Sequence, residues 1–465
     1  MQRAERCVLA LDATLGGSKV DATRDRREAL SRDESEADTV VPSAVVVARD
    51  EDDIAKTLKI CSEYSMAVVP RGAGTGRTGG AAVVVESVVL DTTAMNAVKG
   101  LERDDGLVIV EPGLVTGELH AMLEREGLFF PPDPQSAEWC TLGGNVAENA
   151  GGPRAHRYGV TRDYVRGMRA VTMDGSAFAV GRRTSKGVTG YDLTSLLVGS
   201  EGTLAVFSEL WLRVIAQPAH VESALATFDS MIDAGAAVLA IAKTGVVARC
   251  VELLDEHCCA VIQADAPSAL PPSAKVVLLI EFDGTERECE AQLERAGGAL
   301  IEARATEVFV ARHSGDRERL WSSRKVLSRA LRARARWKLS EDIVVPRSKL
   351  AAMLDDVRVI SERESIAMPT YGHAGDGNLH VNLLWNDPSE RPRVDRAIRS
   401  LFERTIAHGG TLSGEHGIGT LKRDFLSLEQ SPSLIEAQRS IKRALDPNNL
   451  LNPHKALPAP GHRAC

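Results

Sequence analysis

Residues 70–82 read PRGAGTGRTGGAA, and this glycine-rich stretch determines the fold class more than any other part of the chain. Gly74 to Gly79 fit a GxGxxG pattern, but a Rossmann site needs a helix directly after the loop and an acidic residue about 20 positions on. Residues 81–90 are rich in valine, which predicts a strand, and Asp91 comes too early. We therefore expect a strand–loop–strand cradle whose backbone N–H groups converge on an anion such as a diphosphate. The alternative is a tight hairpin, and five glycines in nine residues beside Arg71 favour the cradle.

The composition is that of a globular protein with a sizeable core. The chain has 465 residues, which suggests two or three domains at about 100–200 residues each, and 44% of them are hydrophobic and 26% charged. The net charge of −8 excludes a generally basic nucleic-acid binder. Aromatic residues make up only 4%, which argues against a base-stacking platform for single strands.

Cysteine usage and hydropathy indicate the compartment. The eight cysteines, at positions 7, 61, 140, 250, 258, 259, 289 and 465, include no CxxC pair. Scattered thiols in a long chain indicate a reducing compartment without a disulfide framework or zinc knuckle. The N-terminus has no sustained apolar run, and no stretch approaches the ~18 apolar residues of a membrane-spanning helix. We expect a cytoplasmic protein, with peripheral contact to a membrane left open.

The order of apolar segments predicts an α+β protein of two domains. A charged helical segment, 1–37, precedes an α+β domain built around glycine-rich loops, 38–217. In the second domain, 218–440, strands at 221–228, 246–254, 275–283 and 299–303 alternate with helices at 230–243 and 286–296. Two β-α-β passes predict a ferredoxin-like sheet. A long Arg-rich helix, 312–336, follows, and residues 441–465 return to the first domain.

Histidines and glycines gather in two C-terminal segments. Residues 371–382 read YGHAGDGNLHVN, with His373 and His380 seven apart, and residues 413–419 read SGEHGIG. Residues 379–385 read as a strand on which His380 and Asn382 share one face. Two imidazoles and a carboxylate in glycine turns favour a divalent-metal site with open positions, for Zn²⁺, Fe²⁺ or Mn²⁺. The alternative is a pair of buried, hydrogen-bonded histidines.

Four sequence blocks resemble the vanillyl-alcohol oxidase/p-cresol methylhydroxylase (PCMH) flavoproteins. They are PRGAGTGRTGGA, then PDP (132–134) with LGGNVAENAGG (142–152), then GYDL (190–193), then VGSEGTL (198–204), in the family's order. The resemblance implies a two-domain FAD-binding PCMH-type fold with a ferredoxin-like α+β cap domain. The first loop has neither the His nor the Cys that some members use to attach FAD, so we expect FAD to be bound non-covalently.

The same resemblance implies a set of FAD-binding residues, with backbone amides on the diphosphate. They are Pro70, Arg71, Gly72, Ala73, Gly74, Thr75, Gly76, Thr78, Gly79, Asp133, Pro134, Gly143, Gly144, Asn145, Asn149, Gly152, Glu201, Gly202, Val206 and, in the closing motif DPNNLLNP (446–453), Asn452.

HAGDGNLH followed by GEHGIG resembles the FAD-linked 2-hydroxy-acid dehydrogenase branch of this superfamily, which includes D-lactate dehydrogenase, the glycolate oxidase FAD subunit and D-2-hydroxyglutarate dehydrogenase. The resemblance covers roughly residues 38–455. It implies that His373, His380 and Glu415 hold the metal, Zn²⁺ before Mn²⁺ or Fe²⁺, and that His416 is the catalytic base beside flavin N5.

Substrate-binding residues are expected on the second domain. WSSRK (321–325) resembles the branch's substrate-arginine motif, which makes Arg324 the candidate for the substrate carboxylate, since Arg binds carboxylates bidentately. Lys338 is a weaker candidate, and Asn382 is expected to hydrogen-bond the substrate. Arginines 329, 332, 334 and 336 are interpreted as a solvated helix face, with steering of an anionic substrate or contact with an anionic membrane as the alternatives.

The sequence therefore predicts oxidation of a D-2-hydroxy acid to the 2-oxo acid, with D-lactate first and D-2-hydroxyglutarate and glycolate as rivals. The segment before Val345–Pro346 lacks the Tyr-Met-Asp-type sequence of bacterial glycolate oxidase, which weakens glycolate. The alternatives are an ether-lipid synthase-like enzyme without net oxidation, which should lack the paired-His segment, and a non-catalytic flavin subunit. Quinone, cytochrome, electron-transfer flavoprotein and oxygen are all open as electron acceptor. A homodimer is compatible with the sequence, which leaves the oligomeric state open.

Overall fold

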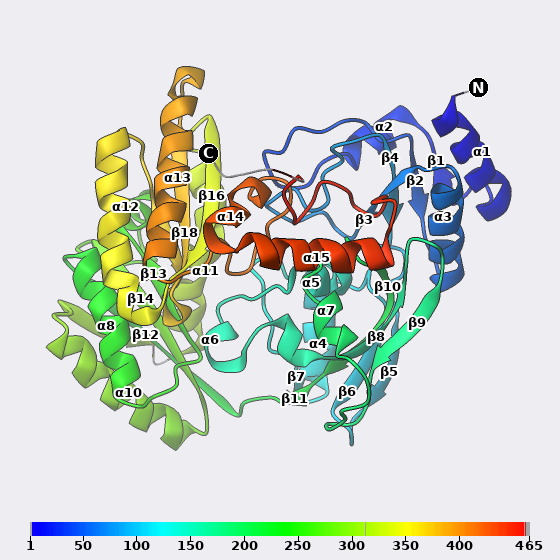
Figure 1. Ribbon diagram of the computed structural model, residues 1–465. Helices are drawn as coiled ribbons and strands as arrows, with labels where there is room; N and C mark the ends of the chain where they lie inside the picture. Colours follow the sequence, from blue (N-terminus) through cyan, green and yellow to red (C-terminus); the bar gives the residue numbers. More distant parts are fainter. Residues whose placement is uncertain (1, 312, 460, 462–465) are drawn as a thin grey trace. The chain divides into compact units, whose positions relative to one another are not determined.

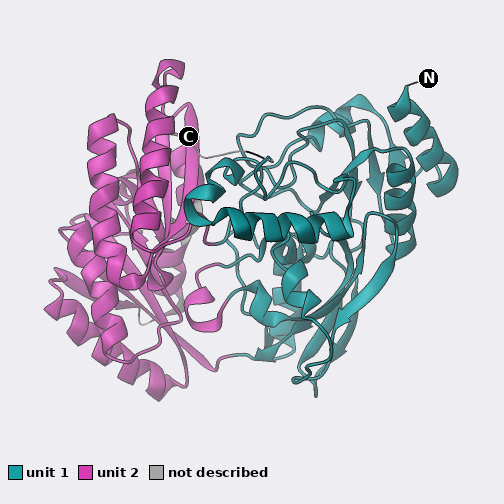
Figure 2. Cartoon of the chain, in the orientation of Figure 1, with its two compact units in different colours: residues 1–151, 160–217, 415–465 teal, residues 152–159, 218–414 magenta. Residues whose placement is uncertain are grey.

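The computed structural model describes residues 2–311, 313–459 and 461, and the chain divides into two compact units (Figure 2). Unit 1 comprises residues 1–151, 160–217 and 415–465, and unit 2 comprises residues 152–159 and 218–414. The chain leaves unit 1 after Gln217 and re-enters it at Glu415, well before the expected position 441. The short segment 152–159, which follows the second glycine-rich block, belongs to unit 2.

Unit 1 contains a four-stranded sheet in the order β1-β2-β4-β3, in which β2, β4 and β3 are parallel (Figure 1). The helix α3 (Glu51–Glu63) connects β2 to β3, and Asp50 caps it by accepting a bond from the Asp53 amide at 2.9 Å. Its buried face, with Ile54 and Leu58, packs on the sheet and on α1. The bounds are α1 Arg3–Leu15, β1 Val20–Asp21, α2 Arg24–Ala29, β2 Ala44–Val47, β3 Ala67–Arg71 and β4 Ser87–Asp91.

The second sheet of unit 1 is antiparallel, in the order β5-β6-β10-β8-β9. Valine-rich strands explain its buried face, since branched side chains fit a pleated, half-buried surface. The bounds are β5 Val98–Glu102, β6 Leu107–Val110, α4 Thr116–Arg125, β7 Leu128–Phe129, α5 Leu142–Glu148, β8 Val165–Val171, β9 Ala177–Gly181, α7 Leu193–Leu197, β10 Val206–Arg213, β11 Ile215–Ala216, α14 Leu426–Glu429 and α15 Pro432–Leu445.

Unit 2 is built on the predicted ferredoxin-like arrangement. The strands β12, β13, β14 and β15 are ordered β15-β12-β14-β13, all antiparallel, and α8 and α10 pack on β12 and β14. The fold class predicted from the sequence, α+β with a ferredoxin-like cap, is thus confirmed. The bounds are β12 His220–Phe228, α8 Met231–Lys243, β13 Cys250–Leu254, α9 Glu256–Asp265, β14 Val276–Gly284, α10 Glu286–Glu302 and β15 Glu307–Ala311.

Three further strands extend this sheet beyond β13, in the order β17-β18-β16. They carry His373, His380 and Lys338, three of the predicted site residues. The helices α9 and α11 pack against each other, and their apolar side chains form one cluster with Leu254, Leu279 and Tyr371 of the sheet. The remaining bounds of unit 2 are α6 Ala155–Tyr158, α11 Ser314–Arg332, β16 Trp337–Val344, α12 Leu350–Glu364, β17 Thr370–His373, β18 Asn378–Trp385 and α13 Arg391–Ala407.

Several expectations about elements were wrong. The strand expected at 299–303 is the end of α10, and the strand is β15, at 307–311. The Gly/Asn-rich stretch 142–152 contains the unexpected helix α5, and α9 was also missed. The Arg-rich helix begins at Ser314, after Arg312, which lies outside the described residues, and ends at Arg332.

The seven cysteines that the structure describes are buried free thiols, and Cys465 lies outside the described residues.

Candidate active site

Four polar side chains lie in a row across the sheet of unit 2: Glu252 on β13, His373 on β17, His380 on β18 and Asp342 on β16. The register pairs Glu252 with His373, and Asp342 with His380. His380 also pairs with Tyr371, two residues before His373. Directly opposed residues of antiparallel strands point to the same face, so all four side chains share one face. Each of the four is at most 5% exposed.

The two imidazoles in this row meet through their Nε2 atoms. The Nε2 atoms of His373 and His380 lie 3.4 Å apart, and the ring planes are at 89°. Two nitrogens that bind one tetrahedral cation at about 2.05 Å are themselves about 3.3 Å apart. The spacing of these two predicted ligands therefore fits a shared divalent cation.

Glu252, which the sequence analysis missed, holds His373 from behind. One carboxylate oxygen, Oε1, lies 2.5 Å from His373 Nδ1, and the other, Oε2, accepts a bond from Arg324 Nε at 2.7 Å. Burial raises the pKa of this carboxyl, but the charges of His373 and Arg324 outweigh burial and lower it to about 2. Glu252 is thus a carboxylate at neutral pH, and it orients His373 so that Nε2 points towards His380.

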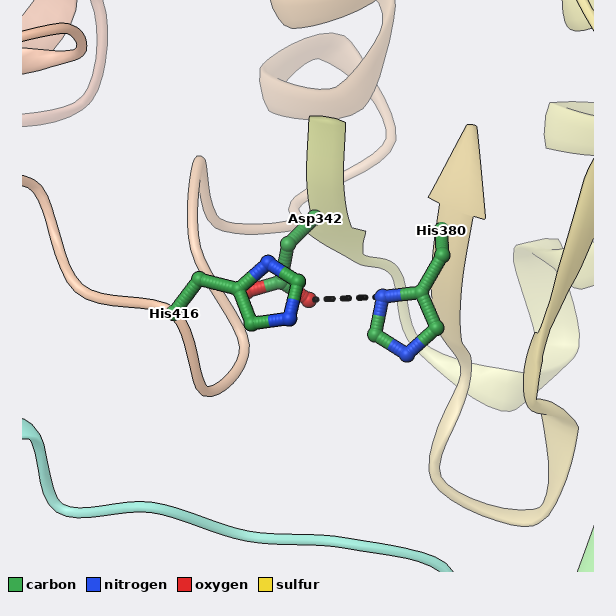
Figure 3. Close-up of side chains that lie close together, drawn as sticks. All are labelled: Asp342, His380 and His416. Atoms are coloured by element: carbon green, nitrogen blue, oxygen red, sulfur yellow. Dashed lines mark ion pairs between the residues drawn. The ribbon is translucent and has the colours of Figure 1, made fainter. Parts of the chain in front are cut away.

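Asp342, also missed, stands in the corresponding position behind His380 (Figure 3). Its Oδ1 lies 3.7 Å from His380 Nδ1 and accepts a bond from Asn378 Nδ2 at 2.6 Å. Its Oδ2 accepts bonds from Ser413 Oγ at 3.0 Å and from the Gly414 amide at 2.8 Å. Both candidate histidine ligands therefore have a buried carboxylate on the Nδ1 side. The Glu252 contact is within hydrogen-bond distance and suits a metal-binding histidine of fixed tautomer, whereas the contact between Asp342 and His380 is an ion-pair contact.

The expected substrate residues differ in their surroundings. Arg324 reaches the row from α11, with its guanidinium carbon 4.4 Å from the centre of the Tyr371 ring. Lys338 is buried, and its ammonium donates to Ser328 Oγ at 2.9 Å. Asn382 is fully buried, its Nδ2 donates to the Pro369 and His380 carbonyls, and its Oδ1 has no hydrogen-bond partner among the described residues.

The four arginines that follow Arg324 are exposed, as a solvated surface requires. Arg334 forms a two-bond ion pair with Asp265, at 2.7 and 3.1 Å, and Arg336 lies over the Trp337 ring at 4.5 Å.

Glu415 and His416 are the first residues of unit 1 after the chain leaves unit 2. Within unit 1 the His416 carbonyl accepts a bond from Thr78 Oγ1 at 3.0 Å, which ties it to the first glycine loop. The Glu201 carboxylate accepts the amides of Ile418 at 2.9 Å and Gly419 at 2.6 Å. The predicted base and third ligand are therefore held beside the first and fourth sequence blocks, both of which contain predicted FAD-binding residues.

The glycines of the blocks are needed because the chain approaches itself closely. A Cβ at Gly72 would collide with Thr141 Oγ1, and one at Gly143 would lie 2.7 Å from Pro112 Cβ. Gly74, Gly79 and Gly202 have positive φ angles, which glycine adopts without strain. At these positions the packing of the chain on itself, or a positive φ angle, requires glycine.

The remaining predicted FAD-binding residues lie in or next to these blocks, and all but Gly152 belong to unit 1. Asn145 is buried and donates to Thr116 Oγ1, Asn149 ends α5 in a left-handed conformation, and Val206 begins β10. Asp133 and Pro134 lie in the segment between β7 and α5, and Gly144 lies within α5. Gly152, in contrast, belongs to unit 2.

Buried polar atoms on the glycine-rich blocks fit the binding of a polar ligand such as FAD. Arg71 Nε, Thr141 Oγ1, Glu148 Oε2, Ser200 Oγ and Asn452 Oδ1 are buried without a hydrogen-bond partner in the part of the chain that the structure describes. Native proteins leave few such atoms, since each costs about 1–3 kcal/mol. These five atoms lie in or next to the glycine-rich blocks and the closing motif, where a bound group with many polar atoms, such as FAD, would supply their partners.

Lys455 is a further residue that the sequence analysis did not single out. Its ammonium donates to the carbonyls of Gly79 and Ala82, both at 2.6 Å, and thereby fixes the end of the first loop. Burial lowers its pKa to about 8.

The fold and the two sets of residues define a flavoprotein oxidoreductase with a separate cap unit. Comparison with known families agrees: the family "FAD linked oxidases, C-terminal domain" matches residues 217–456, and the family "FAD binding domain" matches residues 42–181. The chain belongs to the FAD-linked oxidase family.

Individual relatives cover nearly the whole chain. Glycolate oxidase subunit GlcD of Bacillus subtilis strain 168 is 38% identical over 89% of this chain and 89% of its own length. D-lactate dehydrogenase of Anaerostipes hadrus is 33% identical, again over 89% of each chain. The crystal structure of p-cresol methylhydroxylase with substrate bound is 16% identical and shares the fold, with a TM-score of 0.81 over 98% of this chain and 96% of that one.

Among the described residues, none of the helices has the length and apolar character needed to cross a membrane.

Proposed function

We propose that the protein oxidises a D-2-hydroxy acid to the 2-oxo acid with FAD as the hydride acceptor, and that D-lactate is the first substrate to test. The names of the relatives support 2-hydroxy-acid oxidation in general. The single observation that carries the proposal is the pair of imidazoles with Nε2 atoms 3.4 Å apart, each with a buried carboxylate beside Nδ1. A site of this type suits a substrate that chelates through its hydroxyl and carboxylate.

Two bound groups would supply the difficult chemistry. The glycine-rich blocks of unit 1 would hold FAD non-covalently, and FAD would supply the acceptor for the hydride of the substrate Cα. His373, His380 and Glu415 would hold a divalent cation, Zn²⁺ before Mn²⁺ or Fe²⁺, which would supply a lower pKa for the substrate hydroxyl.

The chain's own residues bind the acid and move the proton. We assign the substrate carboxylate to Arg324, whose Nε is held by Glu252 and whose planar fork suits bidentate binding. His416 takes the hydroxyl proton on a ring nitrogen as the hydride leaves Cα, since a neutral imidazole is an effective base near pH 7. Proton and hydride together account for the two electrons and two protons lost when an alcohol becomes a ketone.

The test is anaerobic bleaching of the flavin absorption band near 450 nm in the purified protein. A panel of D- and L-2-hydroxy acids is mixed with the protein, with and without a chelator. We expect one D-acid to bleach the band and the chelator to prevent it. A yellow protein that no acid reduces would refute the activity and favour the non-oxidative relative or the non-catalytic subunit, whereas a colourless protein that takes up no FAD would refute the whole assignment.

Two variants separate the roles. His416→Ala should keep the yellow colour and lose flavin reduction, and reduction at the normal rate would show that another group is the base. His380→Ala should release the metal, and unchanged metal content would contradict its assignment as a ligand.

Denaturation with acid should release FAD from the protein, since we propose that it is not covalently bound.

A further inference from the structure

We propose that Asp342 is a positioning residue that holds the chain just before Glu415 and His416 against the strand that carries His380. The proposal rests on the proposed function, because it gives these residues a common task. It concerns a residue that does not itself touch the substrate.

The contacts of Asp342 divide between two segments. On one side, its Oδ1 accepts from Asn378 and lies 3.7 Å from His380, both on β18. On the other side, its Oδ2 accepts from the Ser413 hydroxyl and the Gly414 amide. The carboxylate therefore joins the predicted ligand strand to the turn of the SGEHGIG motif, and it does so with no exposure to solvent.

Backbone pairing and close packing also hold the turn at residues 411–414 in place. The Val344 amide and carbonyl both pair with Thr411, at 3.2 and 2.9 Å, so the segment before the motif lies along the end of β16. A Cβ at Gly414 would lie 2.6 Å from Asn378 Nδ2 and from Val344 Cγ2, so only glycine fits. Because Glu415 is bonded directly to Gly414, this anchor fixes where the segment with Glu415 and His416 begins.

A carboxylate is required in this position rather than any polar group. Oδ2 faces two donors, the Ser413 hydroxyl and the Gly414 amide. An amide group turned to accept from Asn378 would direct its own NH₂ at those donors. Turned the other way, it would set its NH₂ against Asn378 Nδ2, which also donates to the Ile343 carbonyl, so either orientation opposes donor to donor and replaces a charged acceptor, which makes the stronger bonds, by a neutral one. Asp342→Asn therefore removes the anchor while hardly changing the volume of the side chain.

The test compares three variants of the FAD-loaded, full-length protein. Asp342→Asn should lose both bonds to the turn, and Ser413→Ala should lose only one, so that the second variant remains informative if the first folds poorly. Asp356→Asn is the matched control, because Asp356 also contacts a histidine, His408 at 2.6 Å, but on α12. Zn²⁺ affinity is measured by competition with a chelator, and hydrogen exchange is measured for the peptide spanning residues 411–419.

We expect Asp342→Asn to weaken Zn²⁺ binding by about 10–100-fold and to accelerate hydrogen exchange at least tenfold. Ser413→Ala should have both effects to a smaller extent, and Asp356→Asn should change neither Zn²⁺ affinity nor exchange. Faster exchange with unchanged Zn²⁺ affinity would overturn the proposal, since Asp342 would then be merely structural. Unchanged exchange would overturn it as well. A wild-type protein that binds no Zn²⁺ would refute the proposed metal site instead, and the exchange result would still decide whether Asp342 holds the turn.

Discussion

Replacing Glu252 by Gln should destabilise unit 2 by about 3 kcal/mol at pH 7. The carboxylate is fully buried between His373 and Arg324, which lower its pKa from 4.5 to about 2. A pKa difference of this size corresponds to about 3 kcal/mol in favour of the ionised form. It agrees with the 3–5 kcal/mol that breaking a buried pair typically costs.

The pH dependence has a definite sign. Because the pKa is depressed in the folded state, the stabilisation is fully present above the unfolded value of 4.5 and is lost as the pH falls towards 2. The stability difference between wild type and Glu252→Gln should stay constant from pH 7 to 5 and fall to about half by pH 3.

Urea unfolding of the full-length protein in a chelator measures the effect, so that metal binding does not contribute. Fluorescence reports on unit 2 if Trp139 and Trp211, the tryptophans of unit 1, are replaced by Phe. The matched control is Glu222→Gln, because Glu222 also contacts a histidine, His220 at 2.9 Å, in a more exposed pair. That control should lose less than about 1 kcal/mol. A loss below about 1 kcal/mol for Glu252→Gln, or one that does not change with pH, would refute the reasoning.

Three further changes test other parts of the structure. Gly143→Ala should lower the free energy of unfolding by about 1–3 kcal/mol in a denaturant titration, because its Cβ would lie 2.7 Å from Pro112 Cβ. Gly144→Ala, whose Cβ would lie 3.5 Å from Thr141 Oγ1, should lower it far less, and equal losses would contradict the packing argument. Glu201→Gln should cost about 1.5–3 kcal/mol and accelerate hydrogen exchange at Ile418 and Gly419, and unaltered exchange there would show that the bonds are dispensable. Arg324→Lys should raise KM for the acid at least tenfold while the flavin spectrum is unchanged, because Lys has no planar fork that can contact Glu252 and the substrate carboxylate together. An unchanged KM would show that Arg324 does not bind the substrate.

Local sequence patterns were sufficient where the structure permits only one residue type at a position. The glycine-rich blocks could be recognised because close approaches, as at Gly72 and Gly143, exclude every other residue. The strand expected at 299–303 was wrong because the apolar residues there follow the helical period and not the strand period. Cys289, Ala296 and Leu300 are buried at helical spacing, and Ile301 is 68% exposed, so the run of apolar residues was the buried face of α10 with one outward residue.

Glu252 and Asp342 show why the rest could not be read from the sequence. Glu252 is the single acid of the apolar strand CVELL, and Asp342 stands next to Glu341 in SEDIVV; an acid buried in such a place needs a buried partner. The partner of Glu252 is His373, 121 residues later, and that contact exists only because β17 lies beside β13. The ferredoxin-like pattern fixes the order of β12 to β15, but nothing in it says that β17, β18 and β16 extend the sheet at the β13 edge. Strand order and register decide which side chains face each other, and here they bring both carboxylates behind the two histidines.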